Sequence, residues 1–351
     1  MYGKTQKEVR QKLALVTVAI DEGDYSDPSK LTLGAWLDIW LPEYVEPAVK
    51  PSTRHSYTRI CGYYIKPKLG AIKLTALATH AIQKFYNDLQ RGTDDKAGLS
   101  AKTVKGIHGV LHKALSQAVK LNYLRINPTE SCTLPRLVKK EIKPLDETQI
   151  AEFLTAIQGH EYETIYMLTL FTGMRQSEVL GLHWSCVDFA SGTITVNAQL
   201  LRDYNKGGGY FIATVKNDKM RIITPAPSIM AMLHQHKHKQ SGMRLQAADA
   251  WEDNDLVFTN ALGQHLKHVT IYKNYKRVVT AMGISSARFH DLRHSYAVAA
   301  IRSGDDIKTV QENLGHHTAA FTLDVYGHVT EQMKRESANR MELFIKGVKG
   351  N

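Results

Sequence analysis

An arginine at the start of a predicted helix is the first candidate for chemistry. Residues 172–178 read Thr-Gly-Met-Arg-Gln-Ser-Glu, so a glycine break precedes a helix whose first turn holds Arg175. Glu178 follows three residues later on the same helix face, where its carboxylate can fix the guanidinium while that group points into a cleft. On its own, the segment also fits the start of an ordinary surface helix.

Two further segments carry histidines, an arginine and a tyrosine. Residues 290–295 read His-Asp-Leu-Arg-His-Ser, and on a helix His290 and Arg293 share a face from which both can reach one ligand. Residues 314–316 read Leu-Gly-His, and Tyr326 follows ten residues after His316. A turn at the glycine allows His316 and Tyr326 to converge from adjacent elements. Each segment alone is more often structural than catalytic, so their order and separation carry the prediction.

In this order and at these separations, the three segments resemble the tyrosine recombinase, or phage integrase, family, and in particular the integrases of conjugative transposons and temperate phages. The resemblance covers residues 31 to about 329 and is sharpest at 172–182, 290–295 and 314–328. It implies the family's arginine pair at Arg175 and Arg293 and its two histidine positions at His290 and His316. It also implies that Tyr326 is the nucleophile.

A lysine between two predicted strands completes the implied catalytic set. Lys216 stands ahead of Arg221 and Pro225 and matches the family's β-hairpin lysine. The small hydroxyl residue that the family often has shortly before the arginine is replaced here by Lys219 and Met220. The resemblance therefore assigns Lys216 more loosely than the other five positions.

These side chains suit the exchange of a phosphodiester for a phosphotyrosine. Two forked guanidinium groups can bind the non-bridging oxygens, on which the transition state gathers charge. A phenol with an unperturbed pKa of about 10 needs a base, for which His290 is the candidate. His316 would donate a hydrogen bond to the phosphate, and Lys216 would protonate the departing 5′ oxygen. Since the phosphoester is exchanged and not hydrolysed, we expect neither a metal ion nor another cofactor.

The size and charge of the chain are compatible with DNA as a partner. Its 351 residues are enough for two domains, each with a core. Lysine and arginine number 45 against 34 aspartate and glutamate, for a formal charge of +11. This balance suits a polyanion such as double-stranded DNA, although basic charge alone is weak evidence.

We predict a mainly α-helical protein with a small antiparallel β-sheet, in which an all-helical core-binding domain precedes a mixed α/β catalytic domain. Helices are expected from Leu31 to about Leu124, with Trp36, Leu37 and Trp40 along the first and with later starts at Ser52, Thr79 and Ser100. After the linker, helices are expected at Asp146 to Ile157 and at Tyr162 to Leu170. Three short antiparallel strands are expected at 193–201, 210–216 and 221–224. The predicted boundaries are 1–30 for an N-terminal helix and linker, 31–133, a linker at 134–144, 145–329, and a tail helix at 330–351.

Basic side chains on two predicted helices and in the linker are candidates for DNA contact. An ordinary solvated helix face explains each group about as well. The candidates are Lys50, Arg54, His55, Arg59, Lys102, Lys105, Lys113, Lys139 and Lys140.

The two ends of the chain bear on partners. The start resembles only the trailing helix of an arm-binding domain, so that domain is either truncated or absent. The tail helix carries apolar side chains that need a partner surface, and docking on a neighbouring subunit or on its own domain are both open. We expect self-association, as a tetramer on DNA, with an excisionase and host DNA-bending proteins as possible further partners.

Other patterns point away from alternative classes. Three widely spaced cysteines form no pair typical of a disulfide framework or a zinc site, and no apolar run is long enough to span a membrane. We therefore expect a cytoplasmic, nucleoid-associated protein. The histidines of residues 234–238 fit a solvated helix better than a zinc site, and Tyr204 and Tyr296 fit packing or DNA contact. A catalytically silent DNA-binding regulator and a type IB topoisomerase stay open as alternatives.

Overall fold

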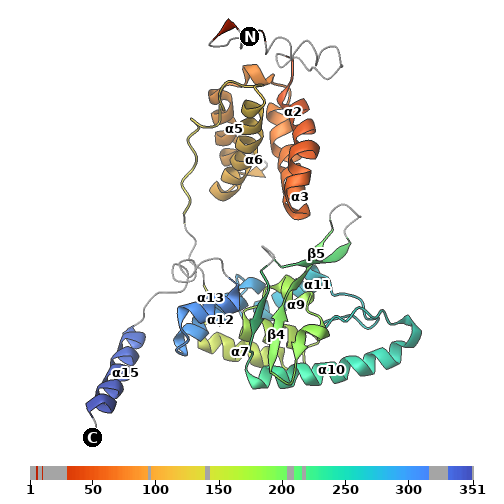
Figure 1. The fold of residues 1–351 in the computed structure, drawn as a ribbon, viewed down its shortest axis with the longest axis vertical. Coiled ribbons are helices and arrows are strands. Elements are labelled where there is room, and N and C mark those ends of the chain that lie inside the picture. Colours follow the sequence, from red (N-terminus) through yellow and green to blue (C-terminus); the bar gives the residue numbers. More distant parts are fainter. Residues whose placement is uncertain are drawn as a thin grey trace. The chain divides into compact units, whose positions relative to one another are not determined.

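The computed structural model of the chain describes residues 5–6, 10, 30–93, 96–138, 143–203, 209–215, 219–315 and 331–349. Two compact units can be distinguished, one spanning Met1–Lys139 and the other spanning Lys140–Arg202 and Gly209–Asn351. Each unit has its own hydrophobic core, and Figure 1 shows the helices and strands of both units. The N-terminal helix predicted within residues 1–30 lies almost wholly outside the described residues.

The first unit is built mainly from helices, as predicted. Ser100 caps the long helix α6 because its hydroxyl accepts a hydrogen bond from the Thr103 amide at 3.3 Å. The predicted apolar stripe of α2 is buried, and the Trp36 indole donates to the Ala114 carbonyl of α6 at 3.0 Å. The helices are α2 (Leu33–Trp40), α3 (Pro51–Ile60), α4 (Lys66–Leu69), α5 (Thr79–Arg91) and α6 (Ala101–Lys120), joined by the tighter or wider turns η1 (Leu41–Val45), η2 (Glu46–Ala48), η3 (Cys61–Ile65) and η4 (Leu74–Ala76).

A short strand pair between α5 and α6 was not predicted. β1 (Gly92–Thr93) and β2 (Lys96–Ala97) pair antiparallel, with Gly92 opposite Ala97. Gly92 ends α5 with a positive φ of 81°, a conformation that glycine adopts without steric cost. Strands of two residues are too short to leave an alternating pattern in the sequence.

The second unit surrounds its sheets with helices. Asp146 caps α7 as part of a capping box with Gln149, which explains why the helix begins where the sequence predicts. The helices are α7 (Glu147–Ile157), α8 (Glu163–Thr172), α9 (Gln176–Leu180), α10 (Pro227–Ala247), α11 (His268–Ala281), α12 (Phe289–Arg302), α13 (Ile307–Leu314) and α15 (Glu331–Lys349), with η5 (Trp184–Cys186) and η7 (Ala248–Ala250) as short turns.

The strands differ from the prediction. β3 (Val187–Asp188), β4 (Thr193–Val196) and β7 (Arg221–Ile223) form one antiparallel sheet in that order, whereas β5 (Ala198–Arg202) pairs only with β6 (Tyr210–Thr214). The predicted strand 193–201 is therefore two strands. At Asn197 the chain changes partner, because β4 pairs with β7 while the Asn197 carbonyl accepts from the Val215 amide that follows β6.

Packing brings the ends of several elements of this unit together. Helix α12 packs on α13 (Figure 1) and on α8. Helix α8 leads into α9, and α13 packs on β7. The carboxyl ends of α8 and α13 are therefore near the first turn of α9. Within the described part of the chain, no helix has the length and apolar character needed to cross a membrane.

Candidate active site

Arg175 is positioned by the break between α8 and α9. Helix α8 ends at Thr172, and Gly173 reverses the chain in the left-handed conformation, with φ 66°. Arg175 then occupies the N-cap position of α9. The Glu178 carboxylate accepts hydrogen bonds from the Arg175 backbone amide at 2.9 Å and from its guanidinium at 2.6 Å. The three-residue spacing thus has the effect expected from the sequence. The Arg175 side chain keeps 27% of its surface exposed.

Glu178 is a buried carboxylate shared by two arginines. Its side chain is 1% exposed, and Arg221 of β7 donates to both of its oxygens, at 2.6 and 3.2 Å. Burial raises the pKa of Glu178, but the hydrogen bond and charge of Arg221 and the charge of Arg175 outweigh burial and hold the pKa at about 2. The carboxylate is therefore ionised at any pH near neutrality.

Arg293 lies on the buried face of α12. Phe289 and Leu292 anchor this helix in the core, and Arg288 closes its first turn through a capping interaction with Asp291. The Arg293 residue is 1% exposed. Its guanidinium donates to the Gly173 carbonyl and to the Leu314 carbonyl, both at 2.6 Å. Arg293 therefore joins the turn that precedes Arg175 to the end of α13.

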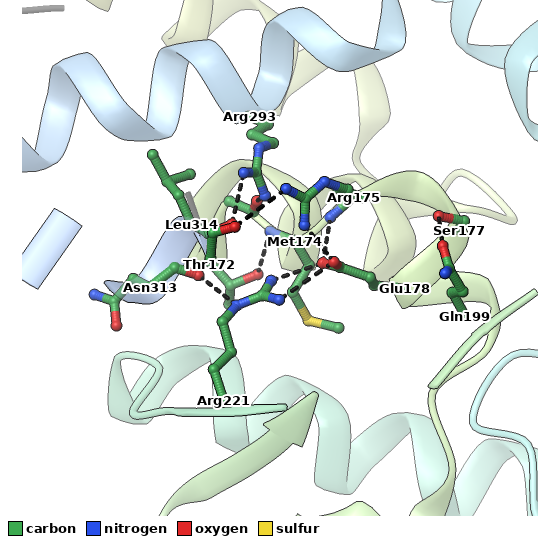
Figure 2. A network of polar contacts seen from close by, with 12 residues as sticks. Thr172, Met174, Arg175, Ser177, Glu178, Gln199, Arg221, Arg293, Asn313 and Leu314 are labelled. Carbon is green, nitrogen blue, oxygen red and sulfur yellow. Dashed lines mark hydrogen bonds and ion pairs between the residues drawn. The ribbon is translucent and has the colours of Figure 1, made fainter. Parts of the chain in front are cut away.

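Three successive carbonyls at the end of α13 accept from three arginines (Figure 2). The Asn313 carbonyl accepts from Arg221 Nε at 2.7 Å, the Leu314 carbonyl accepts from Arg293 at 2.6 Å, and the Gly315 carbonyl accepts from Arg175 at 3.4 Å. The last carbonyls of a helix have no partner within the helix and carry its negative dipole end, so cations stabilise them. His316 is the next residue along the chain.

His290 stands on α12 one turn before His294. Its ring centroid is 4.8 Å from that of His294, and the residue keeps an exposed surface. Desolvation by surrounding protein, together with His294, Arg293 and Arg175, lowers the pKa of His290 to about 4. At neutral pH the imidazole is uncharged and has a nitrogen that can accept a proton.

Arg175 and Arg293 thus meet at the end of α13, and His290 lies three residues before Arg293 on α12. The other predicted catalytic residues, Lys216, His316 and Tyr326, lie outside the described residues. Lys139 and Lys140 of the predicted DNA-contact set also lie outside them.

The remaining basic candidates lie on α3, α6 and the residue before α3. The two helices pack on each other, and Lys113 of α6 lies over the ring of Tyr57 of α3, 5.7 Å from its centroid. Lys50, Arg59, Lys102 and Lys113 are exposed, whereas Arg54, His55 and Lys105 are half-buried. Arg54 pairs with Glu46, which offsets part of its charge. The structure therefore places both basic helices in one unit, side by side.

The structure shows the surroundings of the histidines in residues 234–238 and of Tyr296, whose roles the sequence left open. The rings of His234 and His238 are 4.7 Å apart on α10, while His236 points inward to the Val257 carbonyl at 2.9 Å. Among the described residues, no group of three or more histidine, cysteine, aspartate or glutamate side chains is arranged to hold a metal ion. Tyr296 is a packing residue, since its hydroxyl accepts from Asn313 and its ring lies against Gly173.

Arg221 is the residue whose contacts sequence reasoning missed. In the sequence, Arg221 only helps to locate Lys216. In the structure its side chain binds both Glu178 and the end of α13. The available signal was weak: Arg221 alternates with the exposed Met220 and Ile222, and a strand turns alternate side chains to opposite faces.

Comparison with known proteins identifies the chain. Residues 143–333 match the model of the phage integrase family, and residues 32–90 match that of the phage integrase N-terminal SAM-like domain. A XerC-like tyrosine recombinase of Caldanaerobacter subterraneus subsp. tengcongensis is 29% identical over 98% of this chain and 91% of its own length. The ICEBs1 integrase of Bacillus subtilis is 27% identical over 70% of this chain and 67% of its own.

Solved structures share the fold. The Tn1549 transposon integrase, in complex with transposon right end DNA, superposes with a TM-score of 0.73 at 20% identity, over 89% of this chain and 99% of that one. A lambda integrase dimer bound to a core site gives a TM-score of 0.64 at 17% identity, and the match covers 94% of this chain and 90% of the lambda integrase chain. The predicted fold class and enzyme class are confirmed. The chain belongs to the phage integrase family and is a tyrosine recombinase that cleaves and rejoins DNA strands.

Proposed function

We propose that the chain integrates or excises a mobile element by site-specific recombination, with Tyr326 as the nucleophile. The observation that carries the proposal is the convergence of Arg175 and Arg293, from two different helices, on the last turn of α13. His316 follows that turn directly and Tyr326 follows ten residues later. The proposed nucleophile therefore follows, eleven residues along the sequence, the turn to which both guanidinium groups are bound.

In the proposed reaction, the phenolic oxygen of Tyr326 attacks the scissile phosphorus and the bond from phosphorus to the 5′ oxygen breaks. Arg175 and Arg293 bind the non-bridging oxygens, on which negative charge increases. His290, neutral at pH 7, accepts the phenolic proton, and Lys216 gives a proton to the departing 5′ oxygen. His316 donates a hydrogen bond to the phosphate. Reversal of the same steps with a different 5′-hydroxyl joins the new strand.

The proposed partner is double-stranded DNA at attachment sites. The side-by-side basic helices α3 and α6 offer cations for backbone phosphates. Lys139 and Lys140 of the linker are further candidates from the sequence. Related proteins have been solved with transposon end DNA and, for lambda integrase, as a tetramer on a Holliday junction. We extend this tetramer to the present chain, with excisionase and host DNA-bending proteins as further proposed partners.

The tail helix α15 is the proposed link between protomers. Its side chains at Met341, Leu343, Phe344 and Val348 are all more than half exposed. Apolar side chains gathered on one short helix gain stability when a partner surface covers them. Docking on the neighbouring protomer in a ring of four supplies that surface.

A nicked DNA substrate tests the proposed chemistry. When the nick lies just beside the cut site, the short fragment with the 5′-hydroxyl diffuses away and the protein–DNA adduct accumulates. The wild-type chain should yield an adduct that survives denaturation, and Tyr326→Phe should yield none while binding the DNA equally well. Tyr272→Phe, a change at an exposed tyrosine of α11, is the matched control and should retain the adduct.

An adduct that persists in Tyr326→Phe would overturn the assignment of the nucleophile. A second experiment with two attachment sites in one reaction distinguishes a recombinase from a topoisomerase, because only a recombinase joins strands from different duplexes. Sequencing the joints made with the element's own ends would then give the insertion site. If the chain relaxes supercoiled DNA but joins no strands between duplexes, the recombinase proposal is wrong.

A further inference from the structure

Arg221 occupies an unusual position for a residue that no motif assigns. It lies on the edge strand β7, its side chain is 10% exposed, and its guanidinium contacts two different elements (Figure 2). On one side it donates to both oxygens of Glu178, at 2.6 and 3.2 Å. On the other side its Nε donates to the Asn313 carbonyl at 2.7 Å.

The contact with α13 extends beyond one hydrogen bond. Gly315 lies so close to the Arg221 side chain that a Cβ atom built at Gly315 would be 3.1 Å from Nη1 and 3.2 Å from Cδ. Gly315 also has a left-handed backbone, with φ 61°, which ends the helix and directs the chain toward His316. Arg221 therefore supports the turn from which the segment containing the proposed nucleophile departs.

The contact with Glu178 acts on Arg175. Glu178 Oε1 receives hydrogen bonds from Arg175 at 2.6 Å and from Arg221 at 3.2 Å. Arg175 itself holds the other oxygen, Oε2, through its backbone amide at 2.9 Å. The planar guanidinium of Arg221 binds both oxygens and so further fixes the plane of the carboxylate to which the Arg175 guanidinium is bound.

We infer that Arg221 is a positioning residue for strand cleavage. It locks Glu178 to the last turn of α13 and thereby fixes the direction in which Arg175 faces the scissile phosphate. This inference rests on the proposed function. Arg221 acts through Glu178 and the Asn313 carbonyl, so its role is to position Arg175 and not to take part in the reaction itself.

The experiment compares Arg221→Ala and Arg221→Lys with the full-length wild-type chain on the nicked DNA substrate. The single-turnover rate of adduct formation is measured as a function of protein concentration. We expect Arg221→Ala to lower the rate at saturation by about 100-fold, as for a catalytic group misplaced by about 1 Å. The concentration that gives half of the maximal rate should change by less than about 2-fold, because DNA binding depends mainly on phosphate contacts elsewhere.

Arg221→Lys guards against a folding failure of the alanine variant. Lysine keeps the charge but cannot bridge the carboxylate and the carbonyl, so the rate should lie between those of the wild type and Arg221→Ala. Arg244→Ala is the matched control, because it removes an arginine from an exposed pair with Asp253 in the same unit. It should cleave at the wild-type rate.

A double-mutant comparison separates positioning from general loss of structure. If Arg221 acts through Glu178, the change Arg221→Ala should lower the rate far less in a Glu178→Gln background than in the wild type. If Arg221→Ala lowers the rate by the same factor in both backgrounds, or if Arg221→Ala alone cleaves at the wild-type rate, the inference is overturned. These outcomes are distinct from failure of the proposed function, in which the wild-type chain itself would form no adduct.

Discussion

Replacement of Glu178 by glutamine tests whether the buried carboxylate is the centre of this site. The variant keeps the shape of the side chain and one acceptor oxygen but removes the charge that Arg175 and Arg221 share. Arg221, with a 10% exposed side chain, then loses this counterion while its charge stays largely buried. Loss of one partner of a buried ion pair typically costs about 3–5 kcal/mol.

The pKa of Glu178 gives a second route to the magnitude. Folding lowers this pKa from the ordinary value of 4.5 to about 2, and at roughly 1.4 kcal/mol per pKa unit this difference corresponds to about 3 kcal/mol at neutral pH. Because Arg175 retains access to water, the lower end of the first range is appropriate. For a unit of about 200 residues, a loss of about 3 kcal/mol lowers the melting temperature by about 6–12 °C.

The pH dependence has a defined sign. A carboxylate whose pKa is lowered on folding stabilises the protein above its unfolded pKa, and this contribution is lost as pH falls toward the folded value. The difference in the free energy of unfolding between the wild type and Glu178→Gln should therefore be constant from pH 7 down to about 5. It should become smaller below about pH 4.5.

Scanning calorimetry of the full-length chain measures this difference in melting temperature. Glu312→Gln is the matched control, since Glu312 forms an exposed pair with Lys308 at 3.2 Å, and such pairs contribute about 0–1 kcal/mol. A Glu178→Gln variant that melts within about 1 °C of the wild type at pH 7 would refute the reasoning, because the loss would then be that of a surface pair.

Three further predictions concern the residues around this carboxylate. Gly173→Ala should lower the free energy of unfolding in urea by about 2–4 kcal/mol, because φ is 66° and the new Cβ would lie 2.5 Å from the Tyr296 ring; a loss below about 1 kcal/mol would contradict this close approach. Arg293→Lys should reduce adduct formation by about 100-fold or more, since lysine cannot donate as a fork, and a rate within about 10-fold of the wild type would count against the role of Arg293. With its pKa at about 4, His290 should keep the cleavage rate at low DNA concentration level as pH falls from about 8 to about 5. A pH–rate profile with an inflection near 6.5 that disappears in His290→Asn would show that this histidine titrates normally.

Much of the helical architecture could be predicted from local signals. Ser100 and Asp146 cap the helices that they were expected to begin, and Gly173 ends α8 where the sequence indicates a break. These signals act through hydrogen bonds within a few residues, so they operate before any tertiary structure is known. The Arg175–Glu178 contact belongs to the same class, because three residues on a helix bring two side chains together.

The strands and Arg221 could not be predicted in the same way. Whether Thr193–Val196 pairs with β6 or with β7 depends on which strand tertiary packing brings alongside, and the alternating pattern of β4 is the same in either case. Arg221 reaches Glu178 across 43 positions and Asn313 across 92. A spacing of that size carries no geometric information until the fold is known.

The convergence of three arginines on the end of α13 shows how the phosphate-binding groups are made part of the fold. Positive charges outnumber the single carboxylate, so their mutual repulsion would oppose folding if nothing else balanced them. The carbonyls of Asn313, Leu314 and Gly315 supply the negative ends of dipoles at this point, and they are fixed in place before substrate arrives. A phosphate bound here would add further negative charge to the cluster. Two of the guanidinium groups that hold the last turn of α13, those of Arg175 and Arg293, are the groups proposed to bind it, and the turn that they hold is the one from which the chain continues to His316 and Tyr326.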